Sequence, residues 1–146
     1  MTARLERILV GVDGSDNGKR ALEWAMLLAR QSQAEVIAVH AIGLLAHLGQ
    51  GPAVPSHSHL EELRQTFESE WCAPLRASAI AYRLEFVDGA PVQVLLSVAA
   101  SEAVDVIVVG SRGVGGFPEL LLGSTSHQLA QHARCAVLIV PPNPGR

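Results

Sequence analysis

The residues best suited to chemistry lie in one glycine-rich segment, from Gly110 to Ser126, between an apolar run and a helical pattern. Glycines let backbone amides approach a ligand closely, and the first turn of a helix offers unpaired N–H groups to an anion. Ser124 and Thr125 add hydroxyl donors beside Ser126, and Arg112 adds a positive charge. This composition suits a phosphate-binding loop. On the residues alone, the glycines could instead only shape a long turn and the serines only cap the helix.

Two familiar phosphate-binding templates do not fit this segment. A Walker A loop carries a lysine after its last glycine, whereas Gly123 is followed by Ser124 and Lys19 is the single lysine of the chain. A dinucleotide fingerprint follows the first strand and precedes an acidic residue by about twenty positions. The present segment follows the penultimate predicted strand, so a mononucleotide bound without a lysine fits better.

Length and composition exclude several other classes of function. A chain of 146 residues suits one domain, and an apolar fraction of 49% with 17% charged residues supports a sizeable core. The net charge of −3 and the aromatic content of 4% argue against a nucleic-acid-binding surface.

Cysteine usage and hydropathy predict a cytoplasmic protein that does not cross a membrane. Cys72 and Cys135 are far apart and form no CxxC motif, which argues against a disulfide framework or a zinc site and favours a reducing compartment. No apolar run reaches membrane-spanning length, and residues 1–7 are too charged and too short for a secretory signal.

The elements that must position the segment alternate between strands and helices. Apolar runs predict strands at 8–12, 36–39, 106–109 and 136–140, and the alternation of Tyr82, Leu84 and Phe86 predicts an edge strand. Helical patterns follow Ser15 and cover about 60–71, 92–104 and 124–133. This order predicts a parallel sheet with helices on both faces.

Other features of these elements generate further expectations. Pro74 predicts a kink or two abutting helical pieces around residues 72–75, and the glycines and prolines of 43–59 predict a long surface loop. Trp24, Phe67 and Trp71 are interpreted as core or interface residues.

Several linked motifs carry a resemblance to a known family. The chain contains Gly110, Gly113, Gly123 and Ser124 in the spacing Gly, two residues, Gly, nine residues, Gly-Ser. With this spacing, the chain resembles the ATP-binding subgroup of the universal stress protein family. The likeness extends over almost the whole chain through residues 8–15, 88–91, 105–113 and 137–141.

The resemblance implies one universal stress protein domain over residues 1–146. Its fold would be a Rossmann-like, adenine nucleotide alpha hydrolase-like α/β fold with an open five-stranded parallel sheet in the order 3-2-1-4-5. ATP, with Mg²⁺ as counter-ion, would lie at the carboxyl ends of strands 1 and 4. Asp13 would bind the ribose, Ala41 would meet adenine through its backbone, and Ser124, Thr125 and Ser126 would lie near the phosphates. The remaining expected contacts are Gly11, Gly110, Arg112, Gly113, Gly115, Gly116 and Gly123.

The last predicted strand is apolar throughout, although this strand order places it at an edge. An exposed apolar edge invites pairing, so a twofold partner would cover it, as the resemblance also implies. The expected homodimer contacts are Ala136, Val137, Leu138, Ile139 and Val140.

Several residues have simpler interpretations beside the functional ones. Asp13 could be only a turn former or helix cap. His57 and His59 are interpreted as solvated loop residues, and His40 as a hydrogen-bonded structural residue. No Ser/His/Asp arrangement stands out, and Glu119 is interpreted as an outward-facing carboxylate that could at most assist Mg²⁺ through water.

Three functions remain in competition at this point. The favoured one is an ATP-binding regulatory module of the stress response with an unidentified protein partner. The others are a slow ATPase and a dimeric scaffold with a vestigial nucleotide site. We expect negligible ATP turnover, because the glycine-rich segment has one cation, no lysine and no clear group to orient a nucleophile.

Overall fold

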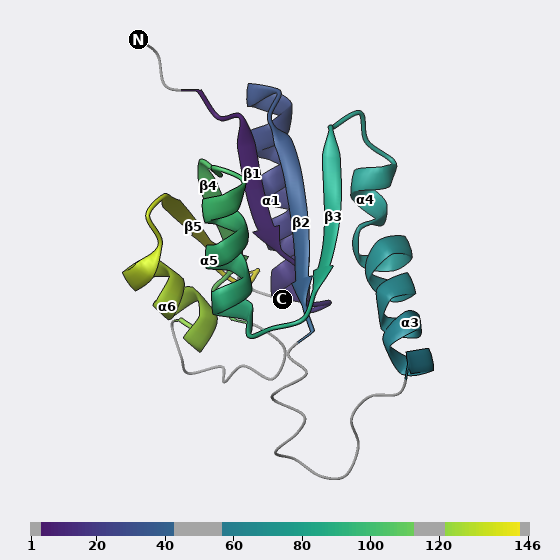
Figure 1. The fold of residues 1–146 in the computed structure, drawn as a ribbon. Helices are drawn as coiled ribbons and strands as arrows, with labels where there is room; N and C mark the ends of the chain where they lie inside the picture. The colour runs from purple at the N-terminus through teal and green to yellow at the C-terminus, as the bar shows by residue number, and fades with distance from the viewer. Residues whose placement is uncertain (1–3, 43–56, 113–121, 144–146) are drawn as a thin grey trace.

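The computed structural model describes residues 4–42, 57–112 and 122–143 and contains one parallel sheet (Figure 1). The five strands lie in the order β3-β2-β1-β4-β5, and every neighbouring pair is parallel. This architecture confirms the predicted fold class and strand order. The strands are β1 (Arg7–Gly11), β2 (Glu35–Ala41), β3 (Tyr82–Val87), β4 (Val106–Gly110) and β5 (Ala136–Val140).

Helices cover both faces of the sheet. One face carries α1 and the α3, η1 and α4 segments, and the other carries α5 and α6 (Figure 1). No helix in the described ranges combines the length and the apolar character needed to cross a membrane. The helices are α1 (Asp16–Ser32), α3 (His57–Thr66), the π-helix η1 (Phe67–Trp71), α4 (Ala73–Arg76), α5 (Pro91–Ser101) and α6 (Ser124–His132).

The unbroken apolar runs of the central strands follow from this double coverage. Ile8 and Val10 belong to the core on the α1 face, whereas Leu9 between them belongs to the core on the α5 face. All three side chains are fully buried. A strand in a covered parallel sheet has no wet face, so it needs no alternation of polar and apolar residues.

Helix α1 has clear signals at both ends. Ser15 is its N-cap residue and accepts a hydrogen bond from Gly18 N, and Gln33 ends it in the left-handed conformation with φ 61°. Its small residues, such as Ala21 and Ala25, pack on the sheet. Trp24 lies on the outer side with 42% of its surface exposed, so of its two interpretations the core one is wrong and the interface one stays a prediction.

The helical break predicted near Pro74 is confirmed, but its form was not foreseen. Helix α4 begins at Ala73, and the preceding segment is a π-helical turn closed by the bond from Cys72 N to Phe67 O at 3.0 Å. Ser69 Oγ donates to the carbonyl of Gln65 one turn earlier. Such side-chain bonds compete with the helical ladder and often distort it.

The edge strand β3 also matches its predicted alternation. Tyr82, Leu84 and Phe86 pack against the core on the α1 face. Arg83, on the opposite face, donates to Glu35 Oε1 at 3.2 Å and to Glu102 Oε2 at 2.8 Å. Helix α5 ends at Ser101 rather than near residue 104, because Ala103 adopts a left-handed conformation with φ 51°.

The pair between Arg83 and Glu102 generates a pH-dependent prediction. The hydrogen bond from Arg83 holds the pKa of the Glu102 carboxyl below its usual value of 4.5. A carboxyl whose pKa is lowered in the folded state stabilises the protein at pH values above the pKa that the carboxyl has in the unfolded chain. This stabilisation is lost as the pH falls through the pKa of the folded state. We therefore expect Glu102→Gln to lower the free energy of unfolding at pH 7, and the difference from wild type to shrink in acid below pH 4.5.

Urea unfolding at several pH values measures this difference. Glu23→Gln, on the exposed side of α1, controls for the loss of one negative charge. A difference between wild type and Glu102→Gln that stays constant from neutral to acid pH would contradict the prediction.

Candidate functional site

The carboxyl ends of β1 and β4 bring two of the predicted site segments together. Because these strands are parallel neighbours, residues that follow them emerge at the same edge of the sheet. The turn Asp13–Ser15 follows β1, and Ser111 and Arg112 follow β4. In an open α/β sheet this edge is the usual position of a ligand site.

Asp13 shapes the turn between β1 and α1. Its Oδ1 accepts hydrogen bonds from Ser15 N at 3.0 Å and from Ser15 Oγ at 2.6 Å. A Cβ on Gly18 would lie 2.5 Å from the same carboxylate oxygen, so glycine leaves the space that the carboxylate occupies. The turn-forming interpretation is therefore confirmed. A carboxylate offers about four acceptor positions, so a ribose contact is compatible with this role and stays a prediction.

Asn17 joins the start of α1 to the ends of β4 and β5. Its Nδ2 donates to Val140 O at 2.9 Å, and its Oδ1 accepts from Arg112 N at 2.8 Å and lies 3.3 Å from Ser111 Oγ. A Cβ on Gly110 would lie 2.8 Å from Asn17 Cγ, so only a glycine admits this side chain. Asn17 is not among the residues predicted from the sequence. Its position four residues before Ala21, in the buried stripe of α1, could have revealed it as a buried amide that needs partners.

The two ends of the glycine-rich segment are held together by Ser111. The Ser111 carbonyl oxygen accepts a hydrogen bond from Gly123 N and a second one, at 3.1 Å, from Ser126 Oγ. Ser111 N donates to Val140 O at 2.8 Å. Ser126 is buried, and its hydroxyl also lies 3.1 Å from Gly123 O. The structure thus gives this hydroxyl a loop-closing role, and its contact with a phosphate stays a prediction.

Helix α6 begins directly at this closure. Gly123 is its N-cap residue, with φ −72° and ψ 170°, and has no side chain to bond the first amides of the helix. Ser124 is exposed and Thr125 is half-buried in the first turn. The bond between Gly123 N and the Ser111 carbonyl brings the start of α6 to the residue that precedes Arg112. Gly113, Gly115, Gly116 and Glu119 lie outside the described residues.

The other two predicted contacts are the last residues of their strands, at the same edge of the sheet. Gly11 is the last residue of β1, where a Cβ would lie 3.3 Å from Val109 Cγ1 and 3.5 Å from Leu95 Cδ1. Its small size therefore permits close packing against α5. Ala41 is the last residue of β2 and pairs in register with Val87 of β3.

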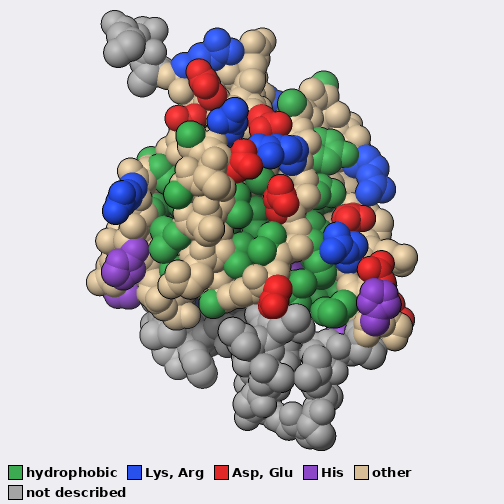
Figure 2. All heavy atoms as spheres, viewed as in Figure 1, with side chains coloured by type: hydrophobic (Ala, Val, Ile, Leu, Met, Phe, Trp, Pro, Cys, Tyr) green, Lys and Arg blue, Asp and Glu red, His purple; other side chains and the backbone are tan. Residues whose placement is uncertain are grey.

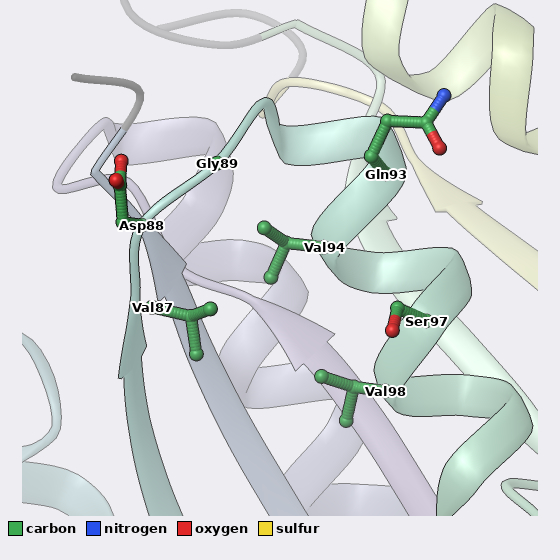
Figure 3. A pocket seen from close by; sticks show the side chains of 7 residues that line it. All are labelled: Val87, Asp88, Gly89, Gln93, Val94, Ser97 and Val98. Atoms are coloured by element: carbon green, nitrogen blue, oxygen red, sulfur yellow. The ribbon is translucent and has the colours of Figure 1, made fainter. Parts of the chain in front are cut away.

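A groove of about 260 Å³ lies beside Ala41, between the end of β3 and α5 (Figure 3). The side chains of Val87, Val94 and Val98 face this gap. Hydrophobic side chains gather here on the surface because α5 packs on β1 and β2 and leaves part of the β3 face open (Figure 2). The complete lining is Val87, Asp88, Gly89, Gln93, Val94, Ser97 and Val98.

The histidines have structural or surface positions. His40 Nδ1 lies 2.7 Å from Val12 O, which confirms its interpretation as a hydrogen-bonded structural residue. His57 and His59 are exposed but stand in the first turn of α3, so their placement in a loop is wrong. Within the described ranges, no three His, Cys, Asp or Glu side chains gather as a metal site would require.

Neither cysteine has the surroundings of a nucleophile. Burial raises the pKa of the Cys72 thiol to about 12 and also raises that of Cys135. A thiol of raised pKa carries almost no thiolate at neutral pH and reacts slowly. Both cysteines are free.

Comparisons with known proteins agree on one family. The model of the universal stress protein family matches residues 4–141. The universal stress protein YxiE of Bacillus subtilis is 35% identical over 145 residues, which cover 92% of this chain and 97% of that protein. The structure of UspA from Lactobacillus plantarum has a TM-score of 0.77 at 23% identity, covering 95% of this chain and 99% of that one. A universal stress protein in complex with cAMP has a TM-score of 0.66 at 28% identity, covering 97% of this chain and all of the other.

The junction at Asn17 generates a prediction about stability. Asn17→Ala removes the acceptor of Arg112 N and leaves a space beside Gly110, so we expect the free energy of unfolding to fall by about 2 kcal/mol or more. Ser111→Ala, which removes only the longer contact at 3.3 Å, should cost clearly less. Denaturant unfolding of both variants measures the difference, and equal losses would contradict the assigned role of Asn17.

Proposed function

The chain belongs to the universal stress protein family, and from this premise we propose that it is an ATP-binding regulatory module of the stress response. The observation that carries the proposal is the convergence at one sheet edge of the Asp13 turn and both ends of the glycine-rich segment. Asn17 and Ser111 hold these parts in fixed relation. A protein of the same family at 28% identity forms a complex with cAMP, which supports an adenine nucleotide as the ligand.

Each part of the nucleotide has a matching part of this edge. The base would lie at the end of β2, where Ala41 offers its backbone and the groove beside Val87 offers apolar surface. Asp13 would accept from the ribose hydroxyls. The phosphates would meet Arg112 and the amides at the start of α6, where the positive end of the helix dipole favours an anion. Gly11, Gly110, Gly113, Gly115 and Gly116 complete the proposed contacts with Gly123, Ser124, Thr125 and Ser126.

ATP is proposed as a ligand and not as a substrate. Amides that bind the phosphates equally well in the ground state and in the transition state do not raise the rate of the chemical step. Phosphoryl transfer is normally catalysed by fixed cations and an oriented nucleophile, and the glycine-rich segment carries no lysine. Mg²⁺ would accompany ATP as a counter-ion of its phosphates. The two free cysteines support a reducing, cytoplasmic location.

The proposal predicts that Gly123→Val removes ATP binding without unfolding the protein. Gly123 has an extended backbone that valine adopts without strain, so the added side chain should block the phosphate end and leave the fold intact. Isothermal calorimetry with ATP and Mg²⁺ measures the affinity. Ala130→Val, on the exposed side of α6, adds bulk away from the proposed phosphate contacts and should bind like wild type.

Two outcomes would overturn this function. Wild-type protein that binds no ATP would favour a scaffold with a vestigial site. Release of phosphate at about 1 per second or faster, abolished by both Gly123→Val and Asp13→Ala, would instead indicate an enzyme. We expect ATP to be recovered intact after prolonged incubation with stoichiometric protein.

A homodimer through β5 is the second part of the proposal. Strand β5 is the last strand of the described sheet, and its apolar residues Val137, Leu138 and Ile139 are only half-buried. Val137 and Ile139 pack toward the α5 face and Leu138 toward the α1 face. Pairing with β5 of a second copy would cover all three and satisfy the edge hydrogen bonds. The full set of proposed contacts is Ala136, Val137, Leu138, Ile139 and Val140.

Leu138→Arg should shift this dimer toward monomer or aggregate. The guanidinium would lie at the paired edge, where it would be desolvated without a partner. Light scattering at micromolar concentration measures the mass. Ala81→Arg places the same charge beside the opposite edge strand and should leave the dimer unchanged, whereas a monomeric wild type would refute the proposed interface.

A further inference from the structure

Gly14 is in contact with a tryptophan from a distant helix. Its φ of 81° is a conformation that favours glycine. A Cβ built on Gly14 would overlap Trp71 Cζ2 and would lie 2.6 Å from Trp71 Cε2. The indole therefore lies directly against the backbone of the turn, at the residue that follows Asp13.

The indole is itself held by other rings. Its centroid lies 5.1 Å from that of His40 with the planes at 76°, and 6.4 Å from that of Phe67 with the planes at 77°. Both are edge-to-face arrangements, which aromatic rings prefer. Phe67 is fully buried in the core, so the π-helical turn that carries both rings is fixed to the sheet.

The same aromatic cluster contacts the β1–α1 turn at a second point. His40 Nδ1 lies 2.7 Å from Val12 O, the carbonyl before Asp13. Because a carbonyl only accepts, this bond requires the proton on Nδ1. The cluster thus contacts the chain immediately before and immediately after Asp13, through Val12 and Gly14.

We propose that Trp71 is a positioning residue, whose indole holds the Gly14 backbone so that Asp13 keeps the geometry required for nucleotide binding. Glycine is the most freely rotating residue of a turn, so a turn that contains it needs restraint from outside. The bonds from Ser15 to Asp13 supply one restraint, and the indole supplies the other. A turn ordered before binding saves the entropic cost of ordering it on binding. The identity of the ligand as a nucleotide rests on the proposed function, whereas the ordering of the turn by Trp71 does not depend on it.

The first test needs no ligand. We expect Trp71→Ala to accelerate hydrogen exchange of the Ser15 and Gly18 amides, which bond to Asp13 Oδ1 and Ser15 Oγ, as followed by NMR. Trp71→Phe keeps a flat ring and should retain most of the protection. If Trp71→Ala does not fold, Trp71→Leu keeps apolar bulk without the ring. Unchanged exchange in the folded variant would overturn the proposal.

The second test is a double-mutant cycle with Asp13→Ala, read by adenosine affinity well below the melting temperature. Trp71→Ala should weaken adenosine binding on the order of tenfold in the wild-type background and little in the Asp13→Ala background, as expected for coupled neighbours. A purely structural role of Trp71 would lower the melting temperature without this coupling. Additive effects would therefore overturn the positioning role.

Trp24 provides the matched control, since it is the other tryptophan of the chain and stands exposed on α1. Trp24→Ala should change neither the exchange of Ser15 nor the affinity. If wild-type protein binds neither adenosine nor ATP, the proposed function fails, and amide exchange at Ser15 still decides whether Trp71 orders the turn.

Discussion

The buried amide of Asn17 is the interaction on which the geometry of the sheet edge depends. One side chain bonds the end of β5 through Val140 O and the second residue after β4 through Arg112 N. A buried amide without partners would be costly, so the three segments are stable only in the arrangement that satisfies it. Gly110 leaves room for this amide, because the side chain of a larger residue would occupy the same space.

The two faces of the sheet make different contributions to this edge. On one face, the ring cluster of His40, Phe67, Trp71 and Phe86 packs against the β1–α1 turn and limits its movement. On the other face, α5 leaves part of β3 uncovered, and the groove beside Val87 results. The edge is therefore rigid on the side of Asp13 and open on the side of Ala41.

Patterns that follow from burial were predictable from the sequence, and contacts between distant segments were not. Continuous apolar runs and the alternation at Tyr82 indicated the strands and their edge, because burial directly determines which residues a strand tolerates. The π-helical turn left no periodic signal. The partners of Asn17 are 95 and 123 residues away, and neither spacing nor composition could connect them. The sequence also left two interpretations of Trp24 open, in the core or at an interface, and only its exposed position in the structure excludes the core.

The sequence separation of these contacts also determines when the edge can form during synthesis. The central strand β1 obtains its β4 neighbour only after residue 106 has been made, and the carbonyl that Asn17 bonds belongs to residue 140. Parallel pairings across such distances form late, because loop closure must precede them. A nascent chain that lacks β5 therefore has its Asp13 turn but not its assembled edge. Any ligand that needs this edge would distinguish finished molecules from unfinished ones.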